Sequence, residues 1–285
     1  MRVGIEVGGT FTDLLCLDKT GKAQFVKVPS VPRRPDEGAY SALVEAGIDV
    51  AEIDELVHGS TVATNAVLER AGARVAFITT QGFRDILFMQ RHNRHLVFEL
   101  AYQKPVPVVQ RRDCFEVAER ILADGSVETP IDLDAVEQAL FSSLANGSYQ
   151  AVAICLLNAY ANPAHERVLA ELISHRFQDL VVTCSSDTAP EFREYERAST
   201  TVIAAHVQPV ISDYLGRLSA TSNQMVSPVT SASCNQTAAD CRVPGCAEIR
   251  KPALFSGPAA GVMGAVRRAR FVGLQQPRYL RHGRY

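Results

Sequence analysis

Residues 2–17 read RVGIEVGGTFTDLLCL and decide the fold of the N-terminal part of the chain. A β-branched run over 2–7 reaches the turn Gly8-Gly9-Thr10, after which the apolar pattern resumes over 11–17. A strand, a tight glycine turn and a second strand predict a β-hairpin. Two glycines let a phosphate approach the backbone, and hydroxyls and acids flank them here. The turn therefore predicts either a nucleotide phosphate site with Mg²⁺ or a plain glycine hairpin with solvated acids.

Strands and helices alternate along the chain up to about residue 220, which predicts an α/β sheet with helical crossovers. The helix that precedes Gly72 is expected to end there in a left-handed turn, and Asp132 is expected to cap the helix that follows it. The expected strands are 23–28, 75–79, 115–122, 151–157 and 180–184, and the expected helices are 36–46, 62–71, 133–145, 164–177 and 199–207.

The composition excludes several classes of protein. The chain has 285 residues, 47% of them hydrophobic, and 29 Lys plus Arg against 31 Asp plus Glu give a net charge of -2. The apolar content predicts a folded protein, and the length favours two domains. Because the chain has no basic excess, we expect neither a nucleic acid nor an anionic membrane as its partner. No run approaches the roughly 20 apolar residues of a membrane span, and residues 1–7 do not resemble a signal peptide. We therefore expect a cytoplasmic protein.

The seven cysteines form no close CxxC pair. Cys16 and Cys155 lie in apolar stretches, where a reduced, buried thiol is expected. A zinc site is suggested by three cysteines near the end of the chain, Cys234, Cys241 and Cys246, but no fourth ligand follows at a suitable spacing.

A second polar cluster comprises His58, Ser60, Thr61, Thr64 and Asn65. Positions 61, 64 and 65 share one face of a helix that begins near Ser60, so they are candidates for a site. The alternative is that Ser60 or Thr61 caps the helix and that His58 is satisfied locally.

Three further groups of polar residues have structural interpretations. The charged run 191–197 is expected to form a solvated helix face, and Asn162 is expected to cap a helix that begins with Pro163. His92 and His95 are three residues apart, without a nearby third ligand, and favour an exposed loop over a metal pair.

Five ordered motifs together resemble the hydantoinase A/5-oxoprolinase family. They are VGIEVGGTFTD at 3–13, HGSTVATNAVLER at 58–70, AFITTQGFRD at 76–85, ANPAHER at 161–167 and EFREYERASTT at 191–201. The resemblance implies an actin-like, ribonuclease H-like ATPase fold for an N-terminal domain over 1–182. It also implies an incomplete second domain: the start of the hydantoinase A ATPase domain over 183–222, followed by an irregular tail over 223–285.

The resemblance also implies a function, namely the ATP-dependent opening of a cyclic amide such as a hydantoin or 5-oxoproline, with a B-type hydantoinase subunit as partner. Gly8, Gly9, Thr10 and Thr12 would hold phosphate, Glu6 and Asp13 would position Mg²⁺, and His58, Thr61 and Asn65 would line the cleft. Family members usually have aspartate at the position of Glu6. Three alternatives remain open: an inactive truncated fragment, a ketone carboxylase subunit, and a small-molecule kinase of the same superfamily.

The sequence after residue 221 shows neither helix nor strand periodicity. Members of the family carry three motifs in this part, namely Met-Gln-Ser-Asn-Gly-Gly, SGPAAG and Asp-Met-Gly-Gly-Thr, and only SGPAAG is present here, at 256–261. One choice of codons for residues 233–240 reads Met-Gln-Ser-Asn-Gly-Gly in a shifted frame, and one for residues 280–285 reads Phe-Asp-Met-Gly-Gly-Thr. The second motif is the family's second phosphate loop. The hypothesis is that the coding sequence contains frameshifts and ends prematurely, which resequencing of the gene from residue 215 onward tests.

Overall fold

The computed structural model describes residues 1–31, 34–92, 97–223 and 231–233, and it divides the chain into two compact units. Unit 1 comprises Met1–Glu69 and the chain from Val210 onward, whereas unit 2 comprises Arg70–Pro209. Unit 2 is therefore inserted into the chain of unit 1. The family boundaries expected at 182 and 222 divide the chain differently and stay predictions.

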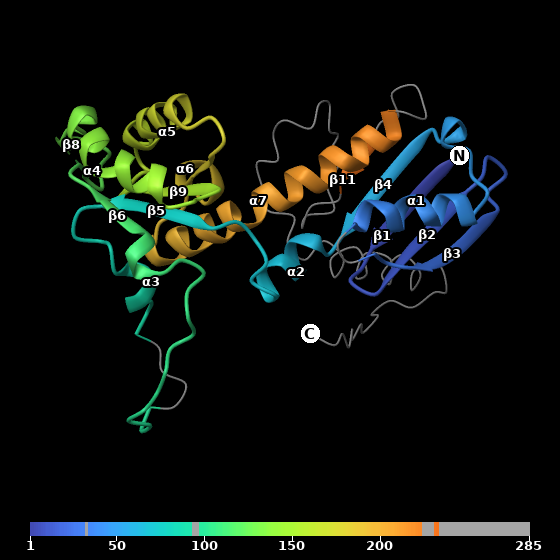
Figure 1. Cartoon of the computed structure of the whole chain (residues 1–285), viewed down its shortest axis with the longest axis horizontal. Coiled ribbons are helices and arrows are strands. Elements are labelled where there is room, and N and C mark those ends of the chain that lie inside the picture. Colours follow the sequence, from blue (N-terminus) through green and yellow to red (C-terminus); the bar gives the residue numbers. More distant parts are fainter. Residues whose placement is uncertain (32–33, 93–96, 224–230, 234–285) are drawn as a thin grey trace. The chain divides into compact units, whose positions relative to one another are not determined.

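Unit 1 contains a five-stranded sheet of order β11-β4-β1-β2-β3 (Figure 1). Its strands are β1 (Arg2–Val7), β2 (Phe11–Leu17), β3 (Ala23–Pro29), β4 (Glu55–Ser60) and β11 (Ser231–Ser233). The first three strands form an antiparallel meander, and β4 lies parallel to β1, with β11 parallel to β4. The predicted hairpin is confirmed.

One face of this sheet holds the core of unit 1. Val3, Ile5 and Val7 alternate along β1 and pack with Leu14 and with α1 (Pro35–Glu45). Full burial of such side chains contributes about 1.5–3 kcal/mol each, which fixes the register because a slip by one residue would expose all of them. The other helical elements of unit 1 are the 3₁₀ turn Val50–Glu52 and α2 (Val62–Leu68).

Unit 2 is built on a four-stranded parallel sheet of order β10-β9-β5-β6. The crossover connections confirm the predicted α/β class. The strands are β5 (Val75–Thr80), β6 (Cys114–Val117), β9 (Ala151–Cys155) and β10 (Val181–Cys184), and β7 (Arg120–Ile121) pairs with β8 (Val127–Thr129) in a separate hairpin.

Helices cover both faces of the parallel sheet, as Figure 1 shows. Alternate residues such as Ile78 and Ile154 pack against α4 (Leu133–Asn146) and α5 (Ala164–Arg176). The intervening residues, such as Phe77, pack against α3 (Ile86–Met89) and against the part of α7 (Glu194–Asn223) that lies in unit 2. Because both faces are buried, β5 and β9 are apolar at successive positions, which is typical of parallel strands. Short helical turns at Arg111–Asp113 and Ser185–Thr188 (α6) complete the unit.

Helix α7 (Glu194–Asn223) is longer than the helix expected from the sequence. It continues past Pro209, which the sequence reading placed beyond the helix end, and its first part belongs to unit 2 and its second part to unit 1. Within the segment after residue 221, for which no strand was expected, β11 pairs with β4. Residues 234–285, with three cysteines, the SGPAAG motif and the shifted-frame segment at 280–285, lie outside the described residues.

Two element boundaries differ from the predicted ones for tertiary reasons. The strand expected over 115–122 is divided between β6 and β7, because Glu119 turns into the interior of unit 2. Helix α2 ends at Leu68, and Arg70 rather than Gly72 adopts a positive φ of 53°. A Cβ on Gly72 would collide with the backbone oxygen of His206, so this glycine is required by a close approach and not by a helix end.

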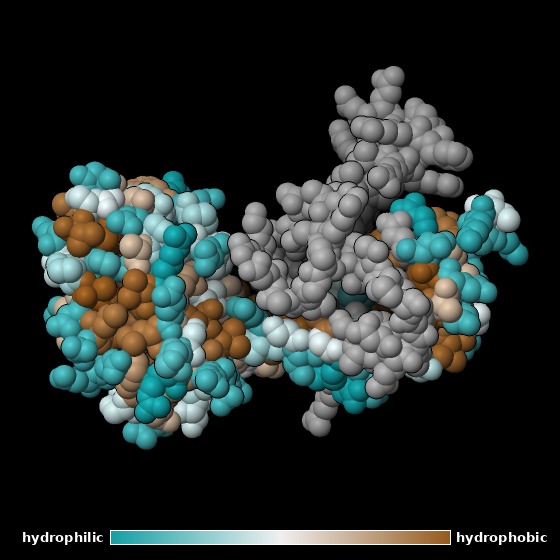
Figure 2. All heavy atoms as spheres, turned by 90° about the horizontal axis from the view of Figure 1, so that it is seen from above, coloured by the Kyte–Doolittle hydropathy of each residue, from teal (hydrophilic) through white to brown (hydrophobic). Residues whose placement is uncertain are grey.

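Apolar surface remains on unit 2 (Figure 2). The segment between α3 and β6 also exposes large apolar side chains. Phe98 and Leu100 are 97% and 102% exposed. The base of this segment is tied down, because Arg70 donates to Val106 O at 2.6 Å and Lys104 donates to Met89 O at 3.0 Å. Of the helices within the described ranges, none has the length and apolar character that crossing a bilayer requires.

Candidate functional site

The glycine turn between β1 and β2 is tight. Gly8 N donates to Phe11 O at 3.0 Å, and a Cβ added to Gly8 would lie only 2.9 Å from that same oxygen. Any other residue at this position would push the two strands apart. Gly9 and Thr10 are exposed at the tip, so the backbone there is accessible to a ligand.

The second predicted cluster lies beside this turn. Thr61 N donates to Val7 O at 3.0 Å, which joins the end of β4 to the end of β1. Asn65, one helical turn later, donates from Nδ2 to Thr61 Oγ1 at 3.4 Å. The same Nδ2 would be 3.1 Å from a Cβ on Gly9. The structure thus brings Gly9, Thr61 and Asn65 together, with the last two half-buried.

The two predicted acids are neighbours on the sheet, because Glu6 and Asp13 face each other in the register of β1 and β2. The Glu6 carboxylate lies against Gly59, its partner on β4, where a Cβ would collide with Oε2. Gly59 therefore makes room for the glutamate, a role that the sequence reading missed. Asp13 forms an ion pair with Lys27 across the sheet at 2.5 Å.

Two of the predicted residues, Thr12 and His58, point to the opposite, helix-covered face of the sheet. The Thr12 side chain is fully buried and its hydroxyl lies 2.9 Å from Ser30 Oγ. His58 is 6% exposed, and its Nε2 is hydrogen-bonded to the hydroxyl of Tyr214 on α7. Burial lowers the pKa of His58 to about 4, so the ring is neutral at pH 7. In the described structure neither side chain is open to a ligand at the turn.

The alternative interpretation of the cluster, helix capping, is also realised in part. Val62 N donates to Ser60 Oγ at 3.1 Å, and Thr64 is buried. Ser60 therefore supports the start of α2, while Thr61 and Asn65 remain the members of the cluster that lie beside the turn.

The residues around the turn fit a nucleotide phosphate and its metal ion. The glycines provide backbone without side chains, Thr61 and Asn65 add a hydroxyl and an amide, and the Glu6 carboxylate is the oxygen ligand that Mg²⁺ prefers. The second acid, Asp13, lies beside Glu6 in the sheet and forms an ion pair with Lys27.

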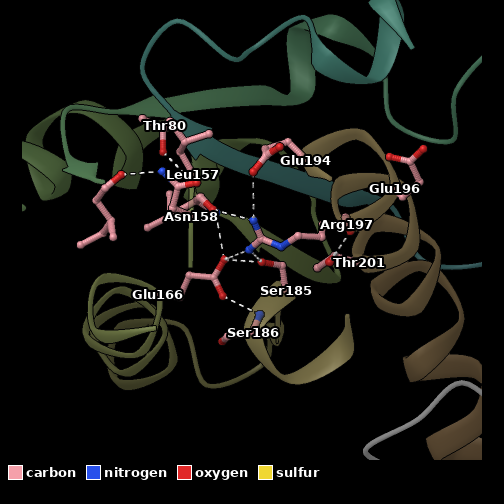
Figure 3. A network of polar contacts seen from close by, with 12 residues as sticks. Thr80, Leu157, Asn158, Glu166, Ser185, Ser186, Glu194, Glu196, Arg197 and Thr201 are labelled. Carbon is pink, nitrogen blue, oxygen red and sulfur yellow. Dashed lines mark hydrogen bonds and ion pairs between the residues drawn. The ribbon is translucent and has the colours of Figure 1, made fainter. Parts of the chain in front are cut away.

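A different polar cluster, which was not predicted from the sequence, lies inside unit 2 at the carboxyl ends of its parallel strands (Figure 3). Glu166 Oε1 accepts from Leu156 N at 2.9 Å and from Ser185 Oγ at 2.5 Å, and Oε2 accepts from Ser186 N at 2.8 Å. Arg197 lies 3.7 Å from Glu166 and donates to Leu156 O at 3.2 Å. Desolvation raises the pKa of Glu166, and its hydrogen bonds oppose that rise.

The expected solvated face of the run 191–197 is therefore wrong for Arg197, which is 1% exposed, although Glu196 is half-buried and pairs with Arg91 at 2.6 Å. Asn162 Oδ1 accepts from Ala164 N at 3.1 Å, but α5 begins at Ala164 with Pro163 as its N-cap, so the predicted cap at Asn162 with Pro163 as the first helical residue is one residue too early. The next residue, His165, is buried, with Nδ1 2.7 Å from Glu119 Oε2.

The two cysteines predicted to be buried and reduced lie within the described residues. Cys16 and Cys155 are buried and free, as expected. In the part of the chain that the structure describes, no group of three or more His, Cys, Asp or Glu side chains is placed to hold a metal ion. His92 is exposed, whereas His95 lies outside the described residues.

Comparisons with known proteins agree with this structure. The caprolactamase subunit alpha of Pseudomonas jessenii is 31% identical over 230 residues, which are 77% of this chain and 33% of that protein. The acetophenone carboxylase gamma subunit of Aromatoleum aromaticum is 31% identical over 240 residues, or 75% of this chain and 32% of that one. Both relatives are named as subunits of an enzyme. The chain spans about a third of the length of the relatives it matches.

A solved structure has the same fold. The ATP-dependent caprolactamase from Pseudomonas jessenii superimposes with a TM-score of 0.82 and 28% identity, covering 96% of this chain and 41% of that one. The family model described as the hydantoinase/oxoprolinase N-terminal region matches residues 2–177, more than half of the chain. The chain therefore belongs to the hydantoinase/oxoprolinase N-terminal region family.

Proposed function

We propose that this chain is the N-terminal part of an ATP-dependent cyclic-amide hydrolase that opens a ring such as a hydantoin or 5-oxoproline. The observation that carries the proposal is the placement of Asn65 and Thr61 beside the exposed Gly8-Gly9 turn, with the Glu6 carboxylate on the neighbouring strand. Two segments that are distant in sequence, residues 6–9 and residues 61–65, thereby contribute to one polar site.

The fold supports an actin-like, ribonuclease H-like ATPase. The unit 1 sheet has an antiparallel meander that carries the phosphate turn, followed by β4 and β11, which run parallel to β1. Likeness to the ATP-dependent caprolactamase from Pseudomonas jessenii supports the same nucleotide.

In the proposed site, the backbone of Gly8, Gly9 and Thr10 would hold phosphate, and Glu6, with Asp13 behind it, would hold Mg²⁺. Thr61 and Asn65 would orient the phosphate from the other side of the turn. Thr12 and His58 would act from beneath the site, because both are buried against helices. When bound, ATP would supply a phosphoryl group to the amide oxygen, which would make the ring carbonyl carbon a better electrophile for water. The ring C–N bond would then break with the amine nitrogen as the leaving group, and a second water would release the phosphate.

The first test is calorimetric titration of the purified chain with ATP and Mg²⁺. We expect saturable binding that Asn65→Ala weakens roughly tenfold, the effect of one lost hydrogen bond to a charged group. Asn146→Ala, at the exposed end of α4, is the matched control and should bind as the unchanged chain does. No binding at millimolar nucleotide, or equal loss in both variants, would overturn the proposal.

Turnover is proposed for the assembly with a B-type subunit, because the chain spans only part of its relatives. The assay is ATP hydrolysis in the presence of hydantoin, 5-oxoproline or caprolactam, with the ring-opened product identified by mass spectrometry. Substrate-dependent ADP release with ring opening supports the hydrolase.

A ketone carboxylase is the second candidate, and the 31% identity to the acetophenone carboxylase gamma subunit favours it. In the same assay, ADP release that requires a ketone and bicarbonate and yields a carboxylated product would select it over the hydrolase.

A further inference from the structure

The buried carboxylate of Glu166 in unit 2 is surrounded by hydrogen-bond donors. Leu156 N lies 2.9 Å from its Oε1 and Ser186 N lies 2.8 Å from its Oε2, and a backbone N–H can only donate. Ser185 Oγ accepts from Arg197, because a guanidinium only donates, so the serine hydrogen is free for Oε1 at 2.5 Å. These donors together match a group that only accepts, which is an ionised carboxylate.

The donors come from separate segments that meet at the carboxyl edge of the unit 2 sheet (Figure 3). Leu156 follows β9, Ser185 and Ser186 follow β10, and Glu166 reaches them from the first turn of α5. Arg197 adds positive charge 3.7 Å from Oε1, and its Nε is a buried donor without a partner among the described residues. Glu166, Ser185 and Arg197 are each at most 1% exposed. Open α/β sheets bind their ligands outside the carboxyl ends of the strands.

We propose that this edge of unit 2 is a binding site for a small carboxylate, which the chain fills with its own Glu166. In the native chain the site is thereby closed to other anions. Glu166→Ala removes Cγ, Cδ and both carboxylate oxygens, which correspond to the heavy atoms of acetate, so the shortened side chain leaves a space of that shape. The inference does not depend on the proposed nucleotide function, whose site lies in unit 1.

Urea unfolding of Glu166→Ala in sodium acetate, and in sodium chloride of the same ionic strength, tests the proposal at pH 7.5. Because acetate binds only the folded variant, the unfolding equilibrium constant should fall by the factor 1 + [acetate]/Kd, about elevenfold at ten times Kd. Glu171→Ala, at an exposed position of α5, is the matched control. This control and the unchanged chain should show no saturable gain in acetate. An equal gain in all three proteins, or none in Glu166→Ala, would overturn the proposal.

Two further measurements separate a carboxylate site from an empty volume. Acetamide has the shape of acetate, but its NH₂ group would oppose either Leu156 N or Ser186 N, so it should not stabilise Glu166→Ala. The double variant Glu166→Ala with Arg197→Met should lose most of the gain in acetate, because the positive charge of the site is gone. Equal stabilisation by acetamide and acetate, or an acetate effect that survives in the double variant, contradicts a carboxylate site.

Refolding from urea decides the question if Glu166→Ala does not fold in chloride. Recovery of the native circular dichroism spectrum in acetate, but not in chloride or acetamide, supports the site, because only acetate replaces the lost group. Failure to recover in acetate overturns the proposal.

Discussion

At the scale of single residues, several side chains owe their state to what buries them. His58 lies under α7 in unit 1, and burial lowers its pKa from 6.5 to about 4. The unfolded chain therefore binds a proton between pH 6.5 and 4 that the folded chain does not, so stability falls as the pH drops through this window. Above pH 6.5 the two states are equally deprotonated at His58 and the effect is absent.

We predict that lowering the pH from 7.5 to 5 costs about 2 kcal/mol of unfolding free energy through His58, since each pKa unit is worth about 1.4 kcal/mol. Urea unfolding of the unchanged chain and of His58→Gln at both pH values measures it. The variant should lack this part of the pH dependence. Identical pH dependence in the two proteins would show that His58 does not titrate abnormally.

Gly72 gives a second prediction at this scale. A Cβ there would collide with the backbone oxygen of His206, an atom that cannot easily move, so Gly72→Ala should destabilise unit 2 by about 1–3 kcal/mol. Gly216→Ala on α7 is the control: no atom of the described residues lies within 4 Å of its new Cβ, and alanine should stabilise the helix by up to about 1 kcal/mol. Thermal or urea unfolding of both variants tests the pair. Equal stability of the two would refute the stated reason for Gly72.

At the scale of elements, the carboxyl ends of the parallel strands in unit 2 are joined by buried charge. Glu166 of α5 and Arg197 of α7 meet between β9 and α6, from opposite sides of the sheet. Removing one member of such a pair leaves an uncompensated buried group, whereas removing both does not.

Arg197→Met should therefore cost about 3–5 kcal/mol of unfolding free energy. The double variant Glu166→Gln with Arg197→Met should be more stable than the sum of the single effects predicts, by about 1–3 kcal/mol. Arg167→Met, which is exposed on α5, should change stability by less than about 0.5 kcal/mol. Strict additivity in urea unfolding would contradict the coupling.

Elements with strong local signals could be predicted from the sequence, and those decided by distant contacts could not. The β1–β2 hairpin and the Asp132 cap, which accepts from Ala135 N at 3.1 Å, follow from local patterns. The break at Glu119 depends on Thr80 and His165, which lie far away in sequence.

The same distinction applies to the site. The proximity of Glu6, Gly9, Thr61 and Asn65 was implied by the motifs, since each motif stands at a strand end. The Thr12 side chain points inward because side chains alternate along β2. The sequence analysis considered only that this hydroxyl is close to the glycines and did not apply the alternation. Tyr214 could not be found, because it is 156 residues from His58 and no local pattern marks it.

At the scale of the whole molecule, the chain leaves unit 1 after Glu69 and returns to it at Val210. Within the described part of unit 2, the segment between α3 and β6 exposes several large apolar side chains. Phe98 and Leu100 are fully exposed, so they add nothing to the core of that unit.

The double variant Phe98→Ser with Leu100→Ser should therefore change the unfolding free energy by less than about 0.5 kcal/mol. Phe77→Ala, at a fully buried position of β5, should cost about 3–5 kcal/mol in the same urea experiment. A loss of more than 1 kcal/mol in the double variant would mean that these side chains are covered in solution.

The central claim is that ATP binds at the Gly8-Gly9 turn of unit 1. The most direct measurement follows the backbone amide resonances of the full chain during titration with ATP and Mg²⁺. The account predicts saturable shifts of Gly8, Gly9 and Thr10 and of the Asn65 side-chain amide, with Gly125 in unit 2 unaffected. Shifts confined to unit 2, or none at millimolar ATP, would contradict it.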